Sequence, residues 1–554
     1  MMPRLFILLF ILLFTINNQT IAQGIFGEKN NFTRQDTLRG TITDERSWWD
    51  LNYYHLDIKV DPEKRTIKGS NTVGYTVLNS NKLMQIDLQE PLNITSVKQN
   101  NKSLNFTREG NAYFIELKKK QKVGKVNYIT IEYEGKPKVA IRAPWDGGLS
   151  WEKDENGIDF IATSCQGLGA SVWWPNKDHM YDEVDSMLMS IEVPQVLVEV
   201  SNGRLRGIEH NHQKGTKTYN WFVSNPINNY GVNINVGDYV SWSAPYAGLN
   251  GSLDVTYWVL RDNEAKAKKH FIQVPKMLEA FEFWMGPYPF YEDGFQLVEA
   301  PYLGMEHQSS ITYGNQFQNG YLGKDLSGTG WGLKFDFIIV HESGHEWFAN
   351  NVTFKDAADI WIHEGFTAYS ESLFVEYYYG KQAGQEYCRG TRKGIRNKFP
   401  MIGDYGVNSS HKDNDIYSKG ANILNMVRQI LNNDDQWRQT LKGIGTVFYH
   451  QTVTSEQIET FIAKETGLEL RSFFNQYLRT SQIPIFKYYK ENGKLVYRWD
   501  ETLQEFNMPI DLKINNKSIR LSPNTSWQSH VIEHDTDLVI EIDPNYYIEV
   551  NQVR

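Results

Sequence analysis

The chain has 554 residues, of which 40% are hydrophobic and 22% charged, and its formal net charge is −9 at pH 7. This length exceeds what one hydrophobic core supports, so about three or four domains are expected. The acidic balance offers no electrostatic basis for binding nucleic acid, and an aromatic content of 14% favours β-rich structure.

Residues 1–22 have the pattern of a secretory signal peptide. Arg4 supplies a positive charge, the ten residues LFILLFILLF (5–14) are apolar, and Thr20 and Ala22 offer small residues before Gln23. Ten apolar residues are too few to span a bilayer, and no later run reaches 18. A retained membrane anchor is the alternative. We expect export to the periplasm or the medium, without stable membrane insertion after the signal is removed.

The chain contains only two cysteines, Cys165 and Cys388. An exported protein of this size with two cysteines is not held together by a disulfide framework. The sequence therefore favours two isolated thiols, with a single disulfide as the alternative.

The remaining sequence predicts a multidomain α+β protein in three parts. Residues 23–260 alternate or form short apolar runs, as in YYHLDIKV, which indicates a large antiparallel β domain. Residues 261–481 are mostly helical in pattern: DNEAKAKKHFIQVPKMLEAFEFWMG has the spacing of one helix, and a capping box opens another at Thr454. Residues 482–554 alternate again and predict a small β-sandwich.

The segment HESGH (341–345) carries two histidines four residues apart. On a helix His341 and His345 share one face, and both imidazoles can reach one zinc ion at about 2.0–2.1 Å. Glu342 between them is placed to hold a water molecule rather than the metal. The alternative is a pair of surface histidines on an amphipathic helix.

A third ligand is available on the next predicted helix. Glu364 follows His345 by nineteen residues, which is enough for a helix–loop–helix return that brings its carboxylate to the same ion. Three protein ligands and one open position are typical of catalytic zinc. Glu371 shares the helix face of Glu364, so it either supports a ligand from behind or is a solvated glutamate.

Four segments together resemble a known family. HESGH followed after eighteen residues by the glutamate of WIHEGF, PYLGMEHQS (301–309), IYSKGANIL (416–424) and SCQGLGASVWWPNKD (164–178) occur in the order found in the thermolysin-like zinc aminopeptidases, the gluzincin family of aminopeptidase N and leukotriene hydrolase. The resemblance covers about residues 50–480. It implies a thermolysin-like catalytic domain, in a three-domain form without the family's long C-terminal helical domain.

The resemblance also implies roles for substrate-binding residues. Glu306 would pair with the free α-amine of a peptide, which would fix the chain end against the metal. Tyr417 would donate a hydrogen bond to the developing oxyanion. Gln166 would line the amine pocket and accept from the amine with its side-chain oxygen.

The segment around Glu306 departs from the family pattern Gly-x-Met-Glu-Asn. Gly304 and Met305 keep their places on the expected substrate-binding strand, but Leu303 replaces the first glycine and His307 the asparagine. We expect Leu303 to crowd the passing substrate backbone. His307 is expected to hydrogen-bond as asparagine does, or to add pH dependence near neutrality.

The sequence therefore predicts a zinc aminopeptidase with one Zn²⁺ per chain, acting on peptides with a free N-terminus. The first alternative is a thermolysin-like endopeptidase, which has the metal but does not recognise the free N-terminus of the peptide. The second is a catalytically silent peptide-binding scaffold. The sequence does not indicate the preferred N-terminal residue, the peptide length or the oligomeric state.

Overall fold

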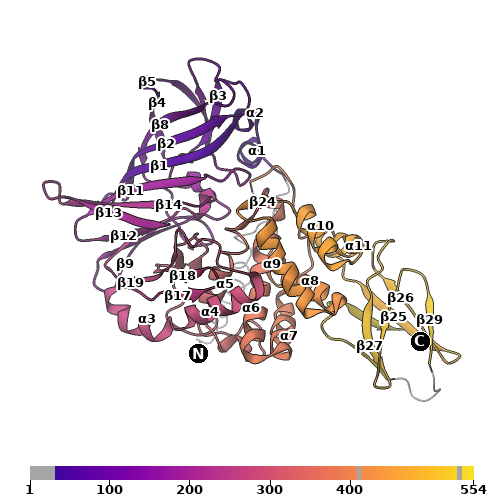
Figure 1. The fold of residues 1–554 in the computed structure, drawn as a ribbon. Coiled ribbons are helices and arrows are strands. Elements are labelled where there is room, and N and C mark those ends of the chain that lie inside the picture. Colours follow the sequence, from indigo (N-terminus) through magenta and orange to yellow (C-terminus); the bar gives the residue numbers. More distant parts are fainter. Residues whose placement is uncertain (1–30, 409–412, 533–538, 554) are drawn as a thin grey trace, which may run out of the picture.

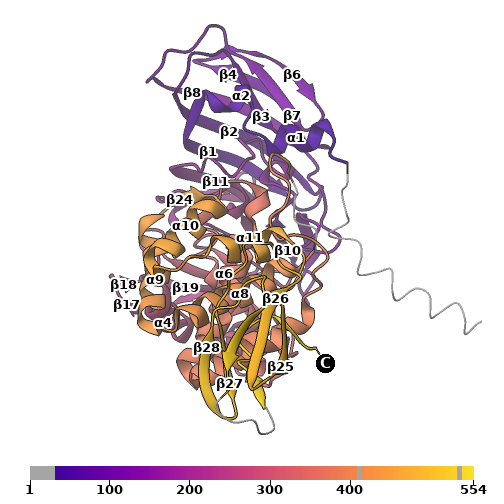
Figure 2. The same ribbon diagram turned by 90° about the vertical axis from the view of Figure 1, so that its right-hand side faces the viewer.

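The computed structural model describes residues 31–408, 413–532 and 539–553. Figure 1 shows a β-rich N-terminal part, a helical middle part and a small β-rich C-terminal part in chain order, and Figure 2 shows the first two stacked on each other. The predicted signal peptide, residues 1–22, lies outside the described residues. Within the described ranges, no helix combines the length and apolar character needed to cross a membrane.

The N-terminal part consists of three β-sheets preceded by two short helices. Its elements are α1 (Arg34–Gly40), α2 (Asp44–Ser47), β1 (Trp49–Asp61), β2 (Thr66–Val77), β3 (Leu83–Asp87), β4 (Asn93–Gln99), β5 (Lys102–Ser103), β6 (Asn105–Glu109), β7 (Ala112–Glu116), β8 (Val126–Gly135), β9 (Gly148–Lys153), β10 (Asp159–Ser164), β11 (Ser186–Pro194), β12 (Val198–Ser201), β13 (Arg204–Asn211), β14 (Thr216–Val223) and β15 (Ile234–Gly237). The sheet orders are β13-β14-β11-β1-β2-β8-β4-β5, β12-β15-β10-β9 and β3-β7-β6. Pairing is antiparallel as predicted, except that β1 and β11 are parallel.

A five-stranded sheet crosses the predicted domain boundary between residues 260 and 261. It contains β16 (Tyr239–Ser243), β19 (Val255–Leu260), β20 (Phe295–Glu299), β21 (Gly304–Met305) and β22 (Ile311–Tyr313), in the order β16-β19-β20-β22-β21. Between β16 and β19 lies the hairpin of β17 (Tyr246–Gly248) and β18 (Gly251–Leu253). The strands on either side of the predicted boundary therefore belong to one sheet. Alternation identifies a strand but not the sheet that it joins.

The middle part is helical around this sheet, with a short two-stranded pairing of β23 and β24. Its helices and these strands are α3 (Glu264–His270), α4 (Gln273–Met285), α5 (Phe337–Gly344), β23 (Val352–Phe354), α6 (Trp361–Tyr379), α7 (Lys381–Gly390), α8 (Asp415–Leu431), α9 (Asp434–Val447), β24 (Gln451–Val453), α10 (Ser455–Thr466) and α11 (Arg471–Arg479). The single helix predicted over residues 262–286 is wrong, because the chain breaks between α3 and α4. Pro275 lies in the first turn of α4, where its missing N–H costs no hydrogen bond. The capping box at Thr454 is confirmed.

Helices α6 and α8 cross at two glycines. A Cβ atom on Gly420 would lie 2.6 Å from the Gly365 Cα, and one on Gly365 would lie 3.1 Å from the Gly420 Cα. Only glycine permits this approach of the two backbones. The crossing matters because Glu364 directly precedes Gly365, and Tyr417 lies one turn before Gly420.

The C-terminal part is the predicted small β-sandwich. Its strands are β25 (Ile485–Glu491), β26 (Lys494–Asp500), β27 (Ile510–Ile514), β28 (Lys517–Leu521), β29 (Gln528–Val531), β30 (Ile540–Ile542) and β31 (Glu549–Gln552). They form the sheets β29-β26-β25-β31 and β28-β27-β30. Its core residues Phe486 and Trp499 belong to the same apolar cluster as the helical part.

The two cysteines are buried free thiols, so the prediction of isolated thiols is confirmed. Cys165 donates to the carbonyl of Tyr230 at 3.4 Å, and Cys388 lies in α7.

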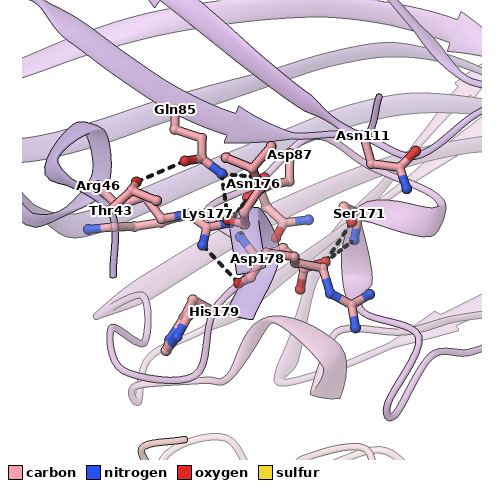
Figure 3. A network of polar contacts seen from close by, with 12 residues as sticks. Thr43, Arg46, Gln85, Asp87, Asn111, Ser171, Asn176, Lys177, Asp178 and His179 are labelled. Atoms are coloured by element: carbon pink, nitrogen blue, oxygen red, sulfur yellow. Dashed lines mark hydrogen bonds and ion pairs between the residues drawn. The ribbon is translucent and has the colours of Figure 1, made fainter. Parts of the chain in front are cut away.

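A buried polar network fastens the first two helices to the loop that follows β10 (Figure 3). The guanidinium of Arg46 in α2 pairs with Asp87, and both side chains are buried. The backbone N–H of Asp178 donates to Asp87 at 3.2 Å, while the Asp178 carboxylate accepts from the Ser171 hydroxyl at 2.5 Å. A charge pair that is buried in this way is satisfied by several hydrogen bonds and fixes the loop in one conformation.

Arg39 at the end of α1 extends this connection to the middle part. Its Nη2 donates to the carbonyl of Gly167 at 2.6 Å and to that of Asn408 at 3.1 Å. The loop that carries Gln166 is thereby tied to both the first helix and the helical part.

We predict that Gly420→Ala lowers the free energy of unfolding by about 1–3 kcal/mol, because the added methyl group overpacks the α6–α8 crossing. Gly445→Ala in α9 is the matched control, since the nearest atom to its added Cβ lies at 3.6 Å. That change should be neutral or stabilising by up to about 1 kcal/mol. Urea unfolding of both variants provides the test, and equal stability of the two would contradict the proposed role of the crossing.

Candidate active site

Helix α5 places the two histidines. The carboxylate of Asp336 caps the helix by accepting from the N–H groups of Ile338 and Ile339 at 2.9 and 3.1 Å. His341 lies in the last turn, and His345 is the C-cap residue with helical φ and ψ of −64° and −18°. The predicted helical spacing is therefore present, although the regular helix ends one residue before His345.

Helix α6 brings Glu364 to the two imidazoles. Its Oε2 lies 3.7 Å from His341 Nε2 and 3.4 Å from His345 Nε2. All three side chains are buried. Two ligands on one tetrahedral zinc ion are about 3.4 Å apart, so these separations fit a shared metal.

The second nitrogen of each histidine is held from behind. His341 Nδ1 lies 2.7 Å from Glu371 Oε1, and His345 Nδ1 lies 3.0 Å from the carbonyl of Phe348. Because a carboxylate and a carbonyl only accept, Nδ1 carries the proton in each ring and Nε2 is free to bind a metal. Glu371 also accepts from the Tyr387 hydroxyl at 2.6 Å. It is buried, so the alternative of a solvated glutamate is wrong.

An unpartnered buried atom points to the same position. Among the described residues, none donates a hydrogen bond to Glu364 Oε2, although the atom is buried. Such an atom is costly unless it binds a cation. Two imidazoles and one carboxylate with an open side form the ligand set of catalytic zinc, so the residues present fit that ion.

The site opens into a cavity of about 1080 Å³, which we call the central cavity. All but one of the predicted site residues contribute to its wall. They are Gln166, Gly304, Met305, Glu306, His341, Glu342, His345, Glu364, Glu371 and Tyr417.

Glu306 and Glu342 face one another across the floor of the central cavity. Side-chain oxygens of both lie within 4.8 Å of a ring nitrogen of His345. Burial, with the nearby carboxylates of Glu364 and Glu342, raises the pKa of Glu306 to about 8, and burial raises that of Glu342 to about 7. Burial would also raise the pKa of Glu364, but His345 and His341 lower it to about 2. The floor thus gathers carboxyl groups whose ionisation burial disfavours, and a metal ion or an ammonium group bound there would stabilise their charged forms.

Gln166 connects the two ends of the site. Its Nε2 donates to Glu306 Oε1 at 2.6 Å and to Glu364 Oε1 at 3.0 Å. It joins the amine-binding candidate to a metal-ligand candidate through the amide nitrogen, whereas the sequence suggested a role for the amide oxygen.

Tyr417 lies in the first turn of α8 beside the histidines. Its ring stacks on that of His341, with 5.9 Å between centroids. Desolvation and the nearby carboxylates of Glu364, Glu306 and Glu342 raise the pKa of Tyr417 well above its ordinary value. The hydroxyl therefore stays protonated and is able to donate a hydrogen bond into the cavity.

Comparison with known proteins now decides the family. Residues 273–477 match the peptidase family M1 domain, and residues 51–230 match the peptidase M1 N-terminal domain. The chain belongs to peptidase family M1.

The relatives of this M1 family member are distant in sequence. Probable aminopeptidase 2 of Sulfurisphaera tokodaii is 23% identical over 85% of this chain and 59% of its own length. Leukotriene A-4 hydrolase of Xenopus laevis is 22% identical over 75% of this chain and 68% of its own length. The chain thus spans about three fifths to two thirds of these two curated relatives. An M1 zinc metallopeptidase from Deinococcus radiodurans shares the fold, with a TM-score of 0.66, 18% identity and coverage of 78% of this chain and 95% of that one.

His307 does not lie in the substrate-binding position that the sequence predicted. It does not line the central cavity, and its Nδ1 lies 3.3 Å from the Thr312 hydroxyl. Burial lowers the pKa of His307 to about 3, so the expected pH dependence near neutrality is wrong. Glu306 and His307 directly follow β21, and of the two only Glu306 lines the cavity, while His307 is fully buried. Leu303 does line the cavity, as the expected crowding requires.

Tyr230 and His363 belong to the site but were missed in the sequence. The Tyr230 hydroxyl donates to Glu306 Oε1 at 3.1 Å and lies 3.5 Å from His363 Nδ1. Tyr230 comes from the N-terminal part and has no motif around it. His363 lies inside WIHEGF, where the sequence pattern pointed only to its neighbour Glu364 as a ligand.

We predict that Glu371→Gln raises the zinc dissociation constant about 10- to 100-fold, because the amide orients His341 and strengthens its basicity less than the carboxylate does. Competition with a chromogenic chelator measures this. Glu376→Gln on the same helix is the control: Glu376 pairs with Arg428 at 2.7 Å and touches no metal ligand. The control should lose stability but keep the zinc affinity of the folded protein. Equal affinities of both variants would refute the role of Glu371.

Proposed function

We propose that this chain is a zinc-dependent aminopeptidase that removes single residues from the free N-terminus of peptides. The observation that carries the proposal is the short distance between the amine-binding candidate and the metal site: Glu306, Glu342 and His345 offer ligand atoms within 4.8 Å of one another. In an amino acid the amine nitrogen and the carbonyl carbon are about 2.5 Å apart. An amine bound to Glu306 therefore places the first carbonyl group of the chain at the metal site.

The residues of the site divide the chemistry among them. His341, His345 and Glu364 would hold one zinc ion per chain, which when bound polarises a carbonyl group and makes water more acidic. Glu342 takes the proton of the attacking water and passes it to the leaving amine. The Tyr417 hydroxyl donates to the oxyanion that forms at the scissile carbonyl. Glu306, supported by Gln166, holds the α-ammonium in place.

The two alternatives fit the site less well. An endopeptidase must bind an uncharged peptide segment beside Glu306, and this buried carboxyl group would then have no ammonium group to pair with. A silent scaffold would not need both imidazoles oriented by Glu371 and Phe348. The relative from Sulfurisphaera tokodaii and that from Lactobacillus helveticus are named aminopeptidases, which supports the same choice.

The cellular location is part of the proposal. The charge and apolar pattern of residues 1–22 supports export to the periplasm or the medium, where peptides are the substrates. Fusing residues 1–30 to a reporter enzyme that works only outside the cytoplasm tests this directly.

The proposed activity is tested with one peptide in two forms, free and N-acetylated. We expect the free form alone to lose N-terminal residues one at a time. Mass spectrometry of the products measures this. Glu306→Gln should lower kcat/KM for the free peptide about 100-fold, because a buried charge pair is lost. Glu299→Gln is the control, since Glu299 is also buried but accepts from Leu260 and Asn263 outside the cavity.

Two results would contradict the proposal. Equal internal cleavage of both forms would establish an endopeptidase. No cleavage of either form by zinc-loaded protein would favour the scaffold.

A further inference from the structure

The acceptor geometry of Glu306 is set by Gln166 and by two residues outside the family motifs, Tyr230 and Asn350. Gln166 Nε2 and the Tyr230 hydroxyl both donate to Oε1, at 2.6 and 3.1 Å. The backbone carbonyl of Glu306 accepts from Asn350 Nδ2 at 2.9 Å. Because both side-chain donors reach the same oxygen, Oε2 is left to accept from a substrate amine.

The direction of the Tyr230 hydrogen bond is fixed by a chain of donors. The backbone N–H of Phe354 donates to His363 Nε2 at 2.9 Å, so this nitrogen is an acceptor. In the neutral ring the proton is then on Nδ1, which lies 3.5 Å from the Tyr230 oxygen and points its proton at it. The single proton of the Tyr230 hydroxyl is therefore directed to Glu306.

Burial keeps this chain of donors in one arrangement. Tyr230 is 4% exposed and His363 is fully buried. The ring of Phe354 packs against that of His363 at a tilt of 31°, with 4.2 Å between centroids, which restricts rotation of the imidazole. Chains of hydrogen bonds in such surroundings polarise one another in a common direction.

We propose that Tyr230 and His363 are positioning residues for the substrate amine, which hold the Glu306 carboxyl group in one orientation beside Glu342 and Glu364. The inference rests on the proposed aminopeptidase function and deepens it. The N-terminal part of the chain contributes to end recognition through Tyr230 as well as through Gln166. Two donors on Oε1 offset the repulsion from the neighbouring carboxylates and leave Oε2 in a fixed direction.

The test compares two inhibitors that differ only in the amine. Phenylalanine hydroxamate carries an α-amine, and 3-phenylpropanohydroxamate lacks it, while both bind a metal through the same group. Both dissociation constants are measured on zinc-loaded enzyme by calorimetry. The dissociation constant of the amine-free compound divided by that of phenylalanine hydroxamate reports amine recognition alone. Tyr230→Phe should reduce this ratio at least about tenfold, as expected for a lost hydrogen bond to a charged group. Binding of the amine-free inhibitor should change less than about threefold.

Tyr239→Phe is the matched control. Tyr239 is 3% exposed, and its hydroxyl donates to the carbonyl of Glu299 at 2.7 Å, without contact to Glu306. This variant loses a buried tyrosine hydroxyl in the same way and should keep the wild-type ratio.

Two variants of His363 test the donor chain itself. Asparagine retains an N–H donor near the position of Nδ1, whereas leucine removes it, and both lose the acceptor for Phe354. His363→Asn should therefore keep more of the inhibitor ratio than His363→Leu. Zinc content is measured for each variant, so that a change at the adjacent Glu364 is recognised.

The outcomes separate the two proposals. If wild-type enzyme binds both inhibitors equally, amine recognition and the proposed function are both wrong. If wild type discriminates and Tyr230→Phe discriminates as well as wild type, only the inference is overturned. Equal weakening of both inhibitors by Tyr230→Phe also overturns it, because that result indicates a purely structural role.

Discussion

The structure of this site depends on four carboxylates buried around one cavity floor. Glu306, Glu342, Glu364 and Glu371 are each at most 8% exposed. Burying like charges together costs several kcal/mol per group unless cations or donors compensate. Glu371 is compensated by an imidazole and a tyrosine hydroxyl. The other three leave buried carboxyl groups whose negative charge a divalent metal and a substrate ammonium would together compensate.

The two large parts of the chain meet this demand jointly. The helical part supplies the two histidines from α5 and brings Glu364 and Tyr417 together through the close crossing of α6 and α8. The N-terminal β part supplies Gln166 and Tyr230, and it reaches Glu306 with both. The Arg46–Asp87 network and Arg39 hold the Gln166 loop against the first helices (Figure 3). The proposed metal chemistry therefore depends on one part, while the proposed recognition of the chain end depends on the contact between two.

The sequence predicts those parts of the arrangement that depend on residues close together in the chain. The pairing of His341 with His345 is local helix geometry, and Glu364 follows from one helix–loop–helix return, so both could be predicted. Whether Glu371 is buried depends on packing of α6 against other helices, which its spacing alone does not decide. Tyr230 lies far along the chain from Glu306 and has no motif. The same holds for the sheet at the predicted domain boundary, since β16 and β19 have the alternation of the N-terminal strands but belong to one sheet with the later strand β20.

The most direct test of this account is a crystal structure of the zinc-loaded Glu342→Gln variant with a bound tripeptide, with the metal located by anomalous scattering. The account predicts one zinc ion bound by His341 Nε2, His345 Nε2 and Glu364, and the peptide amine on Glu306. A second set of groups near the floor, Glu306, Glu342 and His345, also converges within 4.8 Å. A zinc peak on Glu306 and His345, with the amine elsewhere, would contradict both the ligand assignment and the proposed recognition of the chain end.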